Sequence, residues 1–177
     1  MPFTRDADLE LAFSANLIPA DLNESLAKHS LHIRPLASTD YARGHIRVLG
    51  SLTTVADPGE AAWKERWELL AKSNASASKY FIVVIVSKDT DELVATGTLF
   101  LEPKFLRSLA TAGHIEDITV DSSMQGKGLG KIIIKALTAL SEESGAYKTL
   151  LDCSEDNVPF YNKCGYETKG VYMAKYK

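Results

Sequence analysis

The sequence predicts a single α/β domain in which helices cover the faces of one mixed β-sheet. Its 177 residues suit one domain with a substantial core. The composition, 45% hydrophobic and 24% charged, is that of an ordinary globular protein. Strand-like and helix-like patterns alternate along the chain without an internal repeat. We expect residues 31–177 to form the domain and residues 1–30 to form an N-terminal extension.

The first third of the chain is expected to hold one strand and two helices. Residues 1–30 mix acidic, small and scattered apolar residues, which fits either an arm laid on the surface or a flexible terminus. The alternating stretch at 31–36 predicts a short strand. A helix is expected through 41–49 after a cap at Ser38 or Thr39. The amphipathic pattern at 61–71 predicts a second helix, and the tract at 73–78 predicts a loop.

The rest of the chain predicts a hairpin followed by a strand–helix–strand unit. The β-branched and aromatic run at 79–87 and the strand at 92–102 are expected to pair across a turn at 88–91. Gly97 within the second strand indicates a bulge or a bend. Beyond a mixed loop at 103–113, we expect a strand at 114–120, a helix from Gly130 to near Gly145, a strand at 147–152, a short helix at 157–165 and a closing strand at 166–176 with a bend at Gly170.

The most informative stretch is the turn at 125–131, which reads Gln-Gly-Lys-Gly-Leu-Gly-Lys between a strand and a helix. Glycines let the backbone approach a ligand closely, and the free N–H groups at the start of the helix favour an anion. Lys127 and Lys131 add positive charge. The turn therefore predicts a phosphate-binding site. It lacks the Gly-Lys-Ser/Thr ending of a P-loop, and its spacing does not match Gly-x-Gly-x-x-Gly.

The bulk properties exclude several other classes of protein. A net charge of -3 argues against a nucleic-acid binder. The spacing of the two cysteines and four histidines fits no metal site, and the cysteines are expected to be reduced thiols. No apolar run is long enough to cross a membrane. The acidic N-terminus lacks the apolar core of a secretory signal, so we expect a soluble, cytoplasmic protein.

The pattern Gln125-Gly126-x-Gly128-x-Gly130 resembles the acetyl-CoA-binding turn of the GCN5-related N-acetyltransferases. Its context fits that family too, since a strand precedes it and a helix, a strand and a tyrosine-bearing short helix follow. The resemblance implies the fold of that family, a mixed central sheet flanked by helices. It also implies acetyl-CoA as cosubstrate, with its pyrophosphate held in the turn.

Within that family, the likeness is greater to members that acetylate glucosamine 6-phosphate. It rests on residues 114–120, 147–153 and 157–165, with further matches at 52–55 and 102–104. The resemblance implies formation of N-acetylglucosamine 6-phosphate on the route to UDP-N-acetylglucosamine. It also implies a homodimer whose C-terminal strands and sugar-binding groups are shared between subunits. The sequence departs from those members in the region of sugar-phosphate binding, at Pro103, Arg107 and Tyr176.

Acetyl transfer from a thioester to an amine needs alignment of the reactants, a proton acceptor for the amine, a donor for the oxyanion and a proton for the thiolate. The resemblance implies that Tyr161 protonates the departing thiolate. Asp152 ends a strand, where the sequence alone favours a cap or turn role; the resemblance implies that it lies at the amine. The group that accepts the proton of the amine stays open.

Glu116 and Asp117 are adjacent in a predicted strand, so their side chains point to opposite faces unless the strand bulges. On the sequence alone, a charge pair at the strand end that faces solvent or a lysine is the favoured interpretation. The resemblance instead implies that Glu116 contacts sugar hydroxyls or orients the amine. Asp117 fits a structural role as well as a functional one.

Two further sets of residues complete the expected site. The resemblance implies acetyl-CoA contacts from the strand end, the turn and the short helix, namely Ile118, Thr119, Val120, Gln125, Gly126, Lys127, Gly128, Leu129, Gly130, Lys131, Asn157, Tyr161 and Lys163. Contacts to the sugar phosphate are expected from Thr53, Lys104, Arg107, Glu116, Asp117, Lys148 and Asp152. Each lysine or arginine considered singly is more often a solvated surface charge.

Two other functions remain open on the sequence. A protein of the same fold can acetylate another small amine or a protein N-terminus. A regulator that binds an acyl-CoA without catalysis is a third possibility, and the joint presence of Glu116, Asp152 and Tyr161 argues against it.

Overall fold

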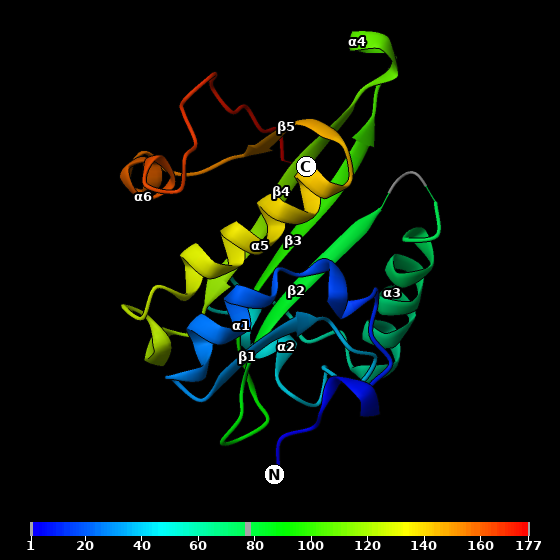
Figure 1. The fold of residues 1–177 in the computed structure, drawn as a ribbon, viewed down its shortest axis with the longest axis vertical. Helices are drawn as coiled ribbons and strands as arrows, with labels where there is room; N and C mark the ends of the chain where they lie inside the picture. The colour runs from blue at the N-terminus through cyan, green and yellow to red at the C-terminus, as the bar shows by residue number, and fades with distance from the viewer. Residues whose placement is uncertain (1, 77–78, 177) are drawn as a thin grey trace.

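The computed structural model describes residues 2–76 and 79–176 and contains one five-stranded sheet (Figure 1). The strands lie in chain order and are β1 (Leu31–Pro35), β2 (Tyr80–Ser87), β3 (Leu93–Pro103), β4 (Thr111–Val120) and β5 (Ala146–Leu151). β1 to β4 pair antiparallel, whereas β5 runs parallel to β4. The predicted mixed sheet is therefore confirmed. A parallel pair needs a crossover connection, and the helix between β4 and β5 supplies it.

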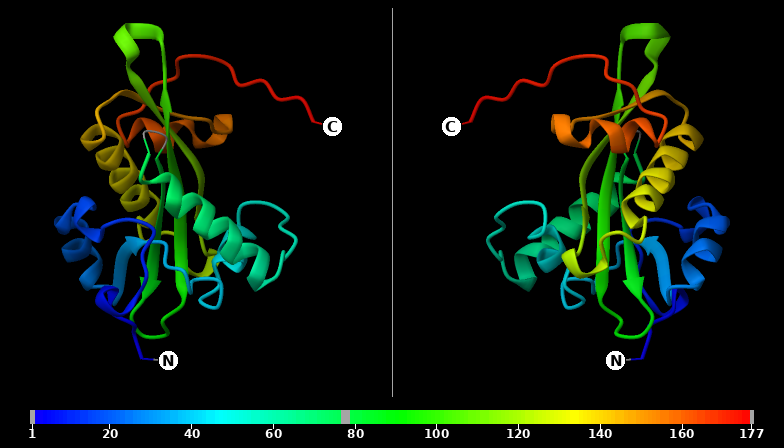
Figure 2. Two further views of the ribbon diagram at one scale, coloured as in Figure 1. Left: turned by 90° about the vertical axis from the view of Figure 1, so that its right-hand side faces the viewer. Right: turned by 90° about the vertical axis from the view of Figure 1, so that its left-hand side faces the viewer.

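Helices cover both faces of the sheet, as Figure 2 shows edge-on. On one face lie α1 (Ala20–Ala27) and α5 (Leu129–Glu143), and on the other lie α2 (His45–Leu49) and α3 (Glu60–Ser73). Each pair of helices packs on its own apolar cluster. β2 is buried on both faces, which explains its continuous run of β-branched residues. The remaining helices are α4 (Leu106–Leu109), α6 (Val158–Asn162) and the 3₁₀ turns η1 (Asp6–Asp8), η2 (Ala15–Leu17), η3 (Ser122–Met124) and η4 (Glu155–Asn157).

Two glycines let α5 lie unusually close to the sheet. A Cβ added at Gly97 in β3 would lie 2.5 Å from Cγ2 of Ile133. A Cβ at Gly113 in β4 would collide with Oγ of Ser141. Neither glycine needs a positive φ, so the reason for glycine here is the close packing of a helix on strands. One contact lies near the start of α5 and the other near its end, so the helix packs closely on the sheet along its length.

The N-terminal segment is an anchored arm. Thr4 donates its backbone N–H and its hydroxyl to the Asp91 carboxylate, and Asp6 pairs with His32 at 2.9 Å. Leu11 forms an isolated β-bridge with Ala37 beyond the edge strand β1. Ile18, which follows η2, and Leu22 and Leu26 of α1 then enter the main core and are 6%, 4% and 0% exposed.

Three sequence-based expectations are wrong in detail. The helix expected through 41–49 begins only at His45, because Gly44 takes a left-handed φ of 87° and the buried Asp40 carboxylate binds Arg34 and the backbone N–H of Ala37. Short helices at Ala20–Ala27 and Leu106–Leu109 were not anticipated. The loop expected at 73–78 begins within the last turn of α3, and residues 77–78 lie outside the described residues.

The largest error concerns the C-terminal segment. We expected a strand at 166–176, but residues 167–176 form no helix or strand and are exposed (Figure 2). A strand needs a hydrogen-bonding edge, and this segment extends away from the sheet. Its apolar side chains stay uncovered, with Val171 92% and Met173 89% exposed.

None of the helices in the part of the chain that the structure describes is long and apolar enough to cross a membrane.

Candidate active site

The candidate site lies where β4 and β5 separate. The two strands pair as far as Ile115 and Leu151, after which β4 continues to Val120 and the chain beyond Leu151 turns away. A cavity of 380 Å³ occupies the resulting space. Its lining comes from the segment after α2, from β4, from the chain after β5 and from α6, and consists of Leu52, Ile115, Glu116, Asp117, Ile118, Asp152, Cys153, Ser154, Asn157 and Tyr161.

A β-bulge brings both acidic residues of β4 to this cavity. Thr96 pairs with Thr119 and Thr98 pairs with Glu116, so Asp117 and Ile118 together face the single residue Gly97. Asp117 has a φ of 54°, which is uncommon for a residue with a side chain. The bulge breaks the alternation of the strand. It meets the condition under which Glu116 and Asp117 serve one site.

The carboxylates of Glu116, Asp117 and Asp152 line the cavity, and the pKa of Glu116 is raised there. Its pKa is raised first by burial, then by the negative charges of Asp152 and Asp117. His114 opposes this shift and lowers the pKa of Glu116. A raised pKa makes Glu116 a better proton acceptor near neutral pH than an exposed glutamate is.

Tyr161 of α6 contributes a phenol that keeps its proton. Its ring packs edge-on against Phe160, with 5.0 Å between centroids. Burial, with smaller contributions from Cys153 and Cys164, raises the pKa of Tyr161 to about 12. At neutral pH the hydroxyl group can therefore donate a hydrogen bond or a proton to a negative sulfur or oxygen in the cavity.

The glycine-rich turn lies directly after β4. Gly126 and Gly128 have φ values of 79° and 75°, and a Cβ at either would meet no atom within 4 Å, so the turn faces open space. α5 begins at Leu129, and its first backbone N–H groups have no carbonyl partner inside the helix. Lys127 and Lys131 are exposed beside it. This combination fits a pyrophosphate.

The turn and Tyr161 belong to one packed unit. A Cβ at Gly130 would lie 3.4 Å from Cζ of Phe160, so the first turn of α5 contacts α6 closely. A ligand that holds its phosphates at 126–131 therefore has Tyr161 nearby. Of the other residues expected to contact acetyl-CoA, Ile118 and Asn157 line the cavity, Thr119 is buried in β4, and Lys163 is exposed at the end of α6.

The cations expected to bind a sugar phosphate lie outside the cavity. Lys104 pairs with Glu102 at 2.5 Å, and Glu102 also binds His114 at 2.9 Å. Arg107 lies over the ring of Tyr147 at 5.2 Å. Lys148 lies over the same ring at 5.5 Å. Arg107 belongs to α4 at the far end of the β3–β4 hairpin (Figure 1).

The cavity also contains residues that the sequence analysis did not select. Leu52, Ile115 and Cys153 each adjoin a selected residue along the chain, and Ser154 lies two residues after Asp152, so proximity to Thr53, Glu116 and Asp152 was the available signal. Thr53 itself is exposed beside Leu52 and does not line the cavity. Among the described residues, no group of three His, Cys, Asp or Glu side chains is arranged to hold a metal ion.

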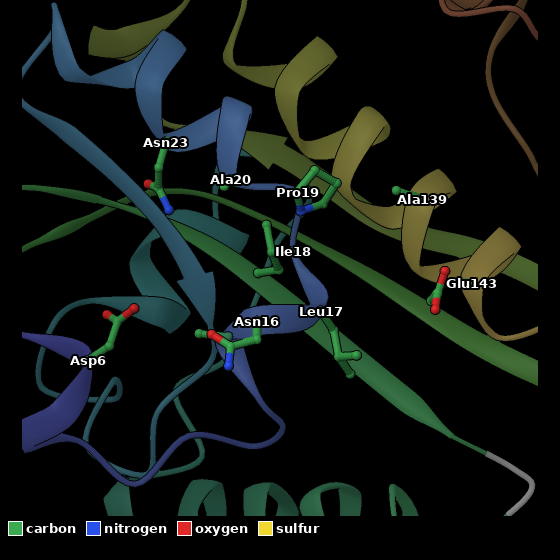
Figure 3. A pocket seen from close by; sticks show the side chains of 10 residues that line it. Asp6, Asn16, Leu17, Ile18, Pro19, Ala20, Asn23, Ala139 and Glu143 are labelled. Atoms are coloured by element: carbon green, nitrogen blue, oxygen red, sulfur yellow. The ribbon is translucent and has the colours of Figure 1, made fainter.

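A second cavity, of 520 Å³, lies between the N-terminal segment and α5 (Figure 3). Its side chains include Asn16, Asn23 and Glu143. Asn23 is engaged with the backbone of Ile33, and Asp6 at its rim is paired with His32. Its lining contains neither a glycine nor a tyrosine. The cavity between β4 and β5 is therefore the better candidate for catalysis.

Comparison with known proteins identifies the class that this fold and site define. Residues 46–166 match the sequence model of the acetyltransferase (GNAT) family. The chain belongs to this family.

Three of the similar proteins are named for the same activity. The chain is 39% identical to Glucosamine 6-phosphate N-acetyltransferase 1 of Dictyostelium discoideum over 86% of this chain and 94% of that protein. It is 42% identical to Glucosamine 6-phosphate N-acetyltransferase of Candida albicans over 79% and 91%. The crystal structure of glucosamine-6-phosphate N-acetyltransferase from Arabidopsis thaliana superposes with a TM-score of 0.79 at 38% identity, covering 82% of this chain and 97% of that one.

Proposed function

We propose that this protein transfers the acetyl group of acetyl-CoA to the amine of glucosamine 6-phosphate, giving N-acetylglucosamine 6-phosphate and CoA. The observation that carries the proposal is the cavity at the strand separation, where three carboxylates meet a protonated tyrosine beside a glycine turn. Relatives that are named for this activity align with most of the chain. The product would feed the route to UDP-N-acetylglucosamine.

On the donor side, the chain supplies binding and a proton. The N–H groups at 126–131 and the charges of Lys127 and Lys131 suit the pyrophosphate of acetyl-CoA. The bulge interrupts the pairing of β4 at Asp117 and Ile118, so backbone groups there are available to the pantetheine arm and the acetyl carbonyl. When the C–S bond breaks, the Tyr161 hydroxyl protonates the thiolate.

On the acceptor side, the carboxylates orient the amine and take its proton. The neutral amine attacks the carbonyl carbon, and the nitrogen then loses one proton as the new C–N bond forms. Glu116 is our candidate for the group that accepts or relays this proton, because its pKa is raised. Asp152, which follows β5 and lines the same cavity, is our candidate for holding the amine. Asp117 completes the acidic wall that attracts a protonated amino sugar.

We also propose that the protein acts as a homodimer. The exposed tail at 167–176 carries apolar side chains that a second subunit would cover. The hairpin tip with Arg107 extends beyond the sheet (Figure 1), as expected of a group that completes the site of a partner subunit. Light scattering tests the proposal: a mass near twice 19.4 kDa is expected, and the monomer mass contradicts it.

We propose the cytoplasm as the compartment of this reaction. Cys153 and Cys164 are both free, which suits a reducing environment.

Release of free thiol in the presence of acetyl-CoA and glucosamine 6-phosphate tests the activity directly. We expect turnover with this sugar well above that with glucosamine, polyamines, amino acids or peptide N-termini at the same concentration. Faster turnover with another amine would replace glucosamine 6-phosphate as the substrate and keep the acetyltransferase class. Acetyl-CoA binding without thiol release for any amine would instead support a regulator.

A further inference from the structure

We infer that Arg47 is a positioning residue that links Leu52, in the lining of the cavity, to the proposed acetyl-CoA turn at 126–131. This inference rests on the proposed function and extends it, because it predicts that each substrate strengthens the binding of the other. The link runs from Asp121 through the Arg47 side chain and α2 to Leu52.

The donor end of the link is Asp121, the first residue after β4. Its carboxylate accepts hydrogen bonds from the backbone N–H and the hydroxyl of Ser123, at 3.0 and 2.6 Å. Its backbone carbonyl accepts the N–H of Met124 at 2.8 Å. Asp121 thus organises η3, the turn that leads directly into Gly126 and Gly128.

The Arg47 guanidinium joins this turn to the sheet and to α2. One nitrogen donates to the Asp121 carboxylate, and another donates to the backbone carbonyl of Leu93 at 2.8 Å. Gly44 leaves room for the side chain, since a Cβ there would lie 3.0 Å from Nε of Arg47. A guanidinium can hold two acceptors in a fixed geometry, which an ammonium group cannot do.

The acceptor end of the link is Leu52, which lines the same cavity as the acidic residues of β4. It is joined to α2 by consecutive backbone hydrogen bonds: Gly50 to Ile46, Ser51 to Val48 and Leu52 to Leu49, each at 3.0 Å. Within α2, Val48 is fully buried, and His45 accepts a hydrogen bond from Trp63 of α3. A shift of α2 therefore carries Leu52 with it.

These contacts predict a coupling free energy between the two substrates. Acetyl-CoA bound at the turn restrains Asp121, and through Arg47 it restrains Leu52 over the acceptor. By thermodynamic linkage, the acceptor must tighten the binding of CoA by the same factor. An ion pair that only stabilised the fold would change the melting temperature and leave this factor unaltered.

Calorimetry with CoA tests the inference without turnover, since CoA carries no acetyl group. The dissociation constant of glucosamine 6-phosphate is measured with and without saturating CoA. In the wild type we expect CoA to tighten it about tenfold. Arg47→Met removes both contacts, and Asp121→Asn removes the charge while leaving an oxygen for Ser123. Each variant should lower the factor to about twofold or less.

Further variants separate coupling from folding. Arg5→Ala removes an arginine from the exposed pair with Asp8 and should leave the factor unchanged. Arg47→Lys keeps the charge and should give an intermediate factor, which maintains the test if Arg47→Met does not fold. The double variant Arg47→Met/Asp121→Asn should lose no more coupling than either single variant.

An unchanged factor in both single variants, or a wild-type factor of one, overturns the inference while the proposed function stands. Failure of wild-type protein to bind glucosamine 6-phosphate overturns both.

Discussion

The donor half and the acceptor half of the candidate site are built in different ways. The donor half is a contiguous unit: β4 ends, the turn at 122–128 follows, and α5 starts at Leu129. The acceptor half gathers Leu52, Glu116 and Asp152 from three separate parts of the chain. Its expected cations remain at the hairpin tip and the start of β5. The comparison teaches that the proposed acetyl-CoA site is continuous in the chain, whereas the proposed sugar-phosphate site depends on distant segments, with its expected cations outside the cavity.

The largest expected effect lies at the junction of the two halves, at Tyr161. Tyr161→Phe removes the proton donor and should lower kcat by about a hundredfold or more, as general-acid loss does. The KM values should change little, because the ring keeps its packing on Phe160. Steady-state thiol release measures both. Tyr172→Phe, in the exposed tail, is the matched control; wild-type kcat in Tyr161→Phe would remove this residue from the mechanism.

The second effect probes the donor half alone. Gly128→Val places a β-branched side chain at a φ of 75° and fills the space that the turn leaves open. Acetyl-CoA affinity, measured by calorimetry, should fall at least about tenfold, since strain at such a residue costs ~1–3 kcal/mol. Gly145, after α5, has a similar φ of 77° and lies outside the turn at 126–131. Gly145→Val is therefore a control for the effect of backbone strain alone. Equal losses in both variants would contradict a phosphate role for the turn.

The third effect asks whether the acceptor half is completed by a second subunit. Arg107→Ala should raise the KM for glucosamine 6-phosphate about tenfold through loss of a charge-assisted contact, with the KM for acetyl-CoA unchanged. If Arg107 serves the site of its partner, mixing inactive Tyr161→Phe with Arg107→Ala should form dimers that contain one intact site. Activity of the mixture above the sum of the separate variants supports sharing. Strict additivity after subunit exchange would place Arg107 in its own site.

The smallest effect is on stability and follows from Glu116. Folding raises its pKa, so the ionised form is disfavoured in the folded state. Glu116 therefore makes its full contribution to the free energy of unfolding below about pH 4.3, the ordinary pKa of a glutamate. This contribution is lost as the pH rises through the raised pKa of the folded state. Glu116→Gln should raise the melting temperature slightly at neutral pH, with the difference vanishing in acid, while acetyl transfer falls.

Glu102 provides the control of opposite sign. Lys104 and His114 lower its pKa, so Glu102→Gln should destabilise at neutral pH and converge with the wild type in acid. The same direction of change in both variants would contradict the electrostatic account of the acidic wall.

Much of the fold was predictable because local patterns and tertiary packing agree. The run that forms β2 is apolar throughout, and both faces of that strand are buried. Gly97 indicated a bulge or a bend, and the bulge lies opposite it in β4. The sequence missed the shortened α2, since Gly44 and the buried Arg34–Asp40 pair override the helical pattern there. It assigned a strand to the C-terminal tail because β-propensity does not reveal whether an edge is available.

The donor turn was determined by the sequence itself, because strand, glycines and helix are neighbours in the chain and their geometry is local. The Arg47–Asp121 pair, the presence of Leu52 and Glu116 in one cavity lining and the raised pKa of Glu116 were decided only by the tertiary structure. Distance between segments, burial and the summed field of neighbouring charges set these features, and no sequence spacing encodes them. The sequence thus predicts where phosphate is held, and the fold decides what the acceptor meets.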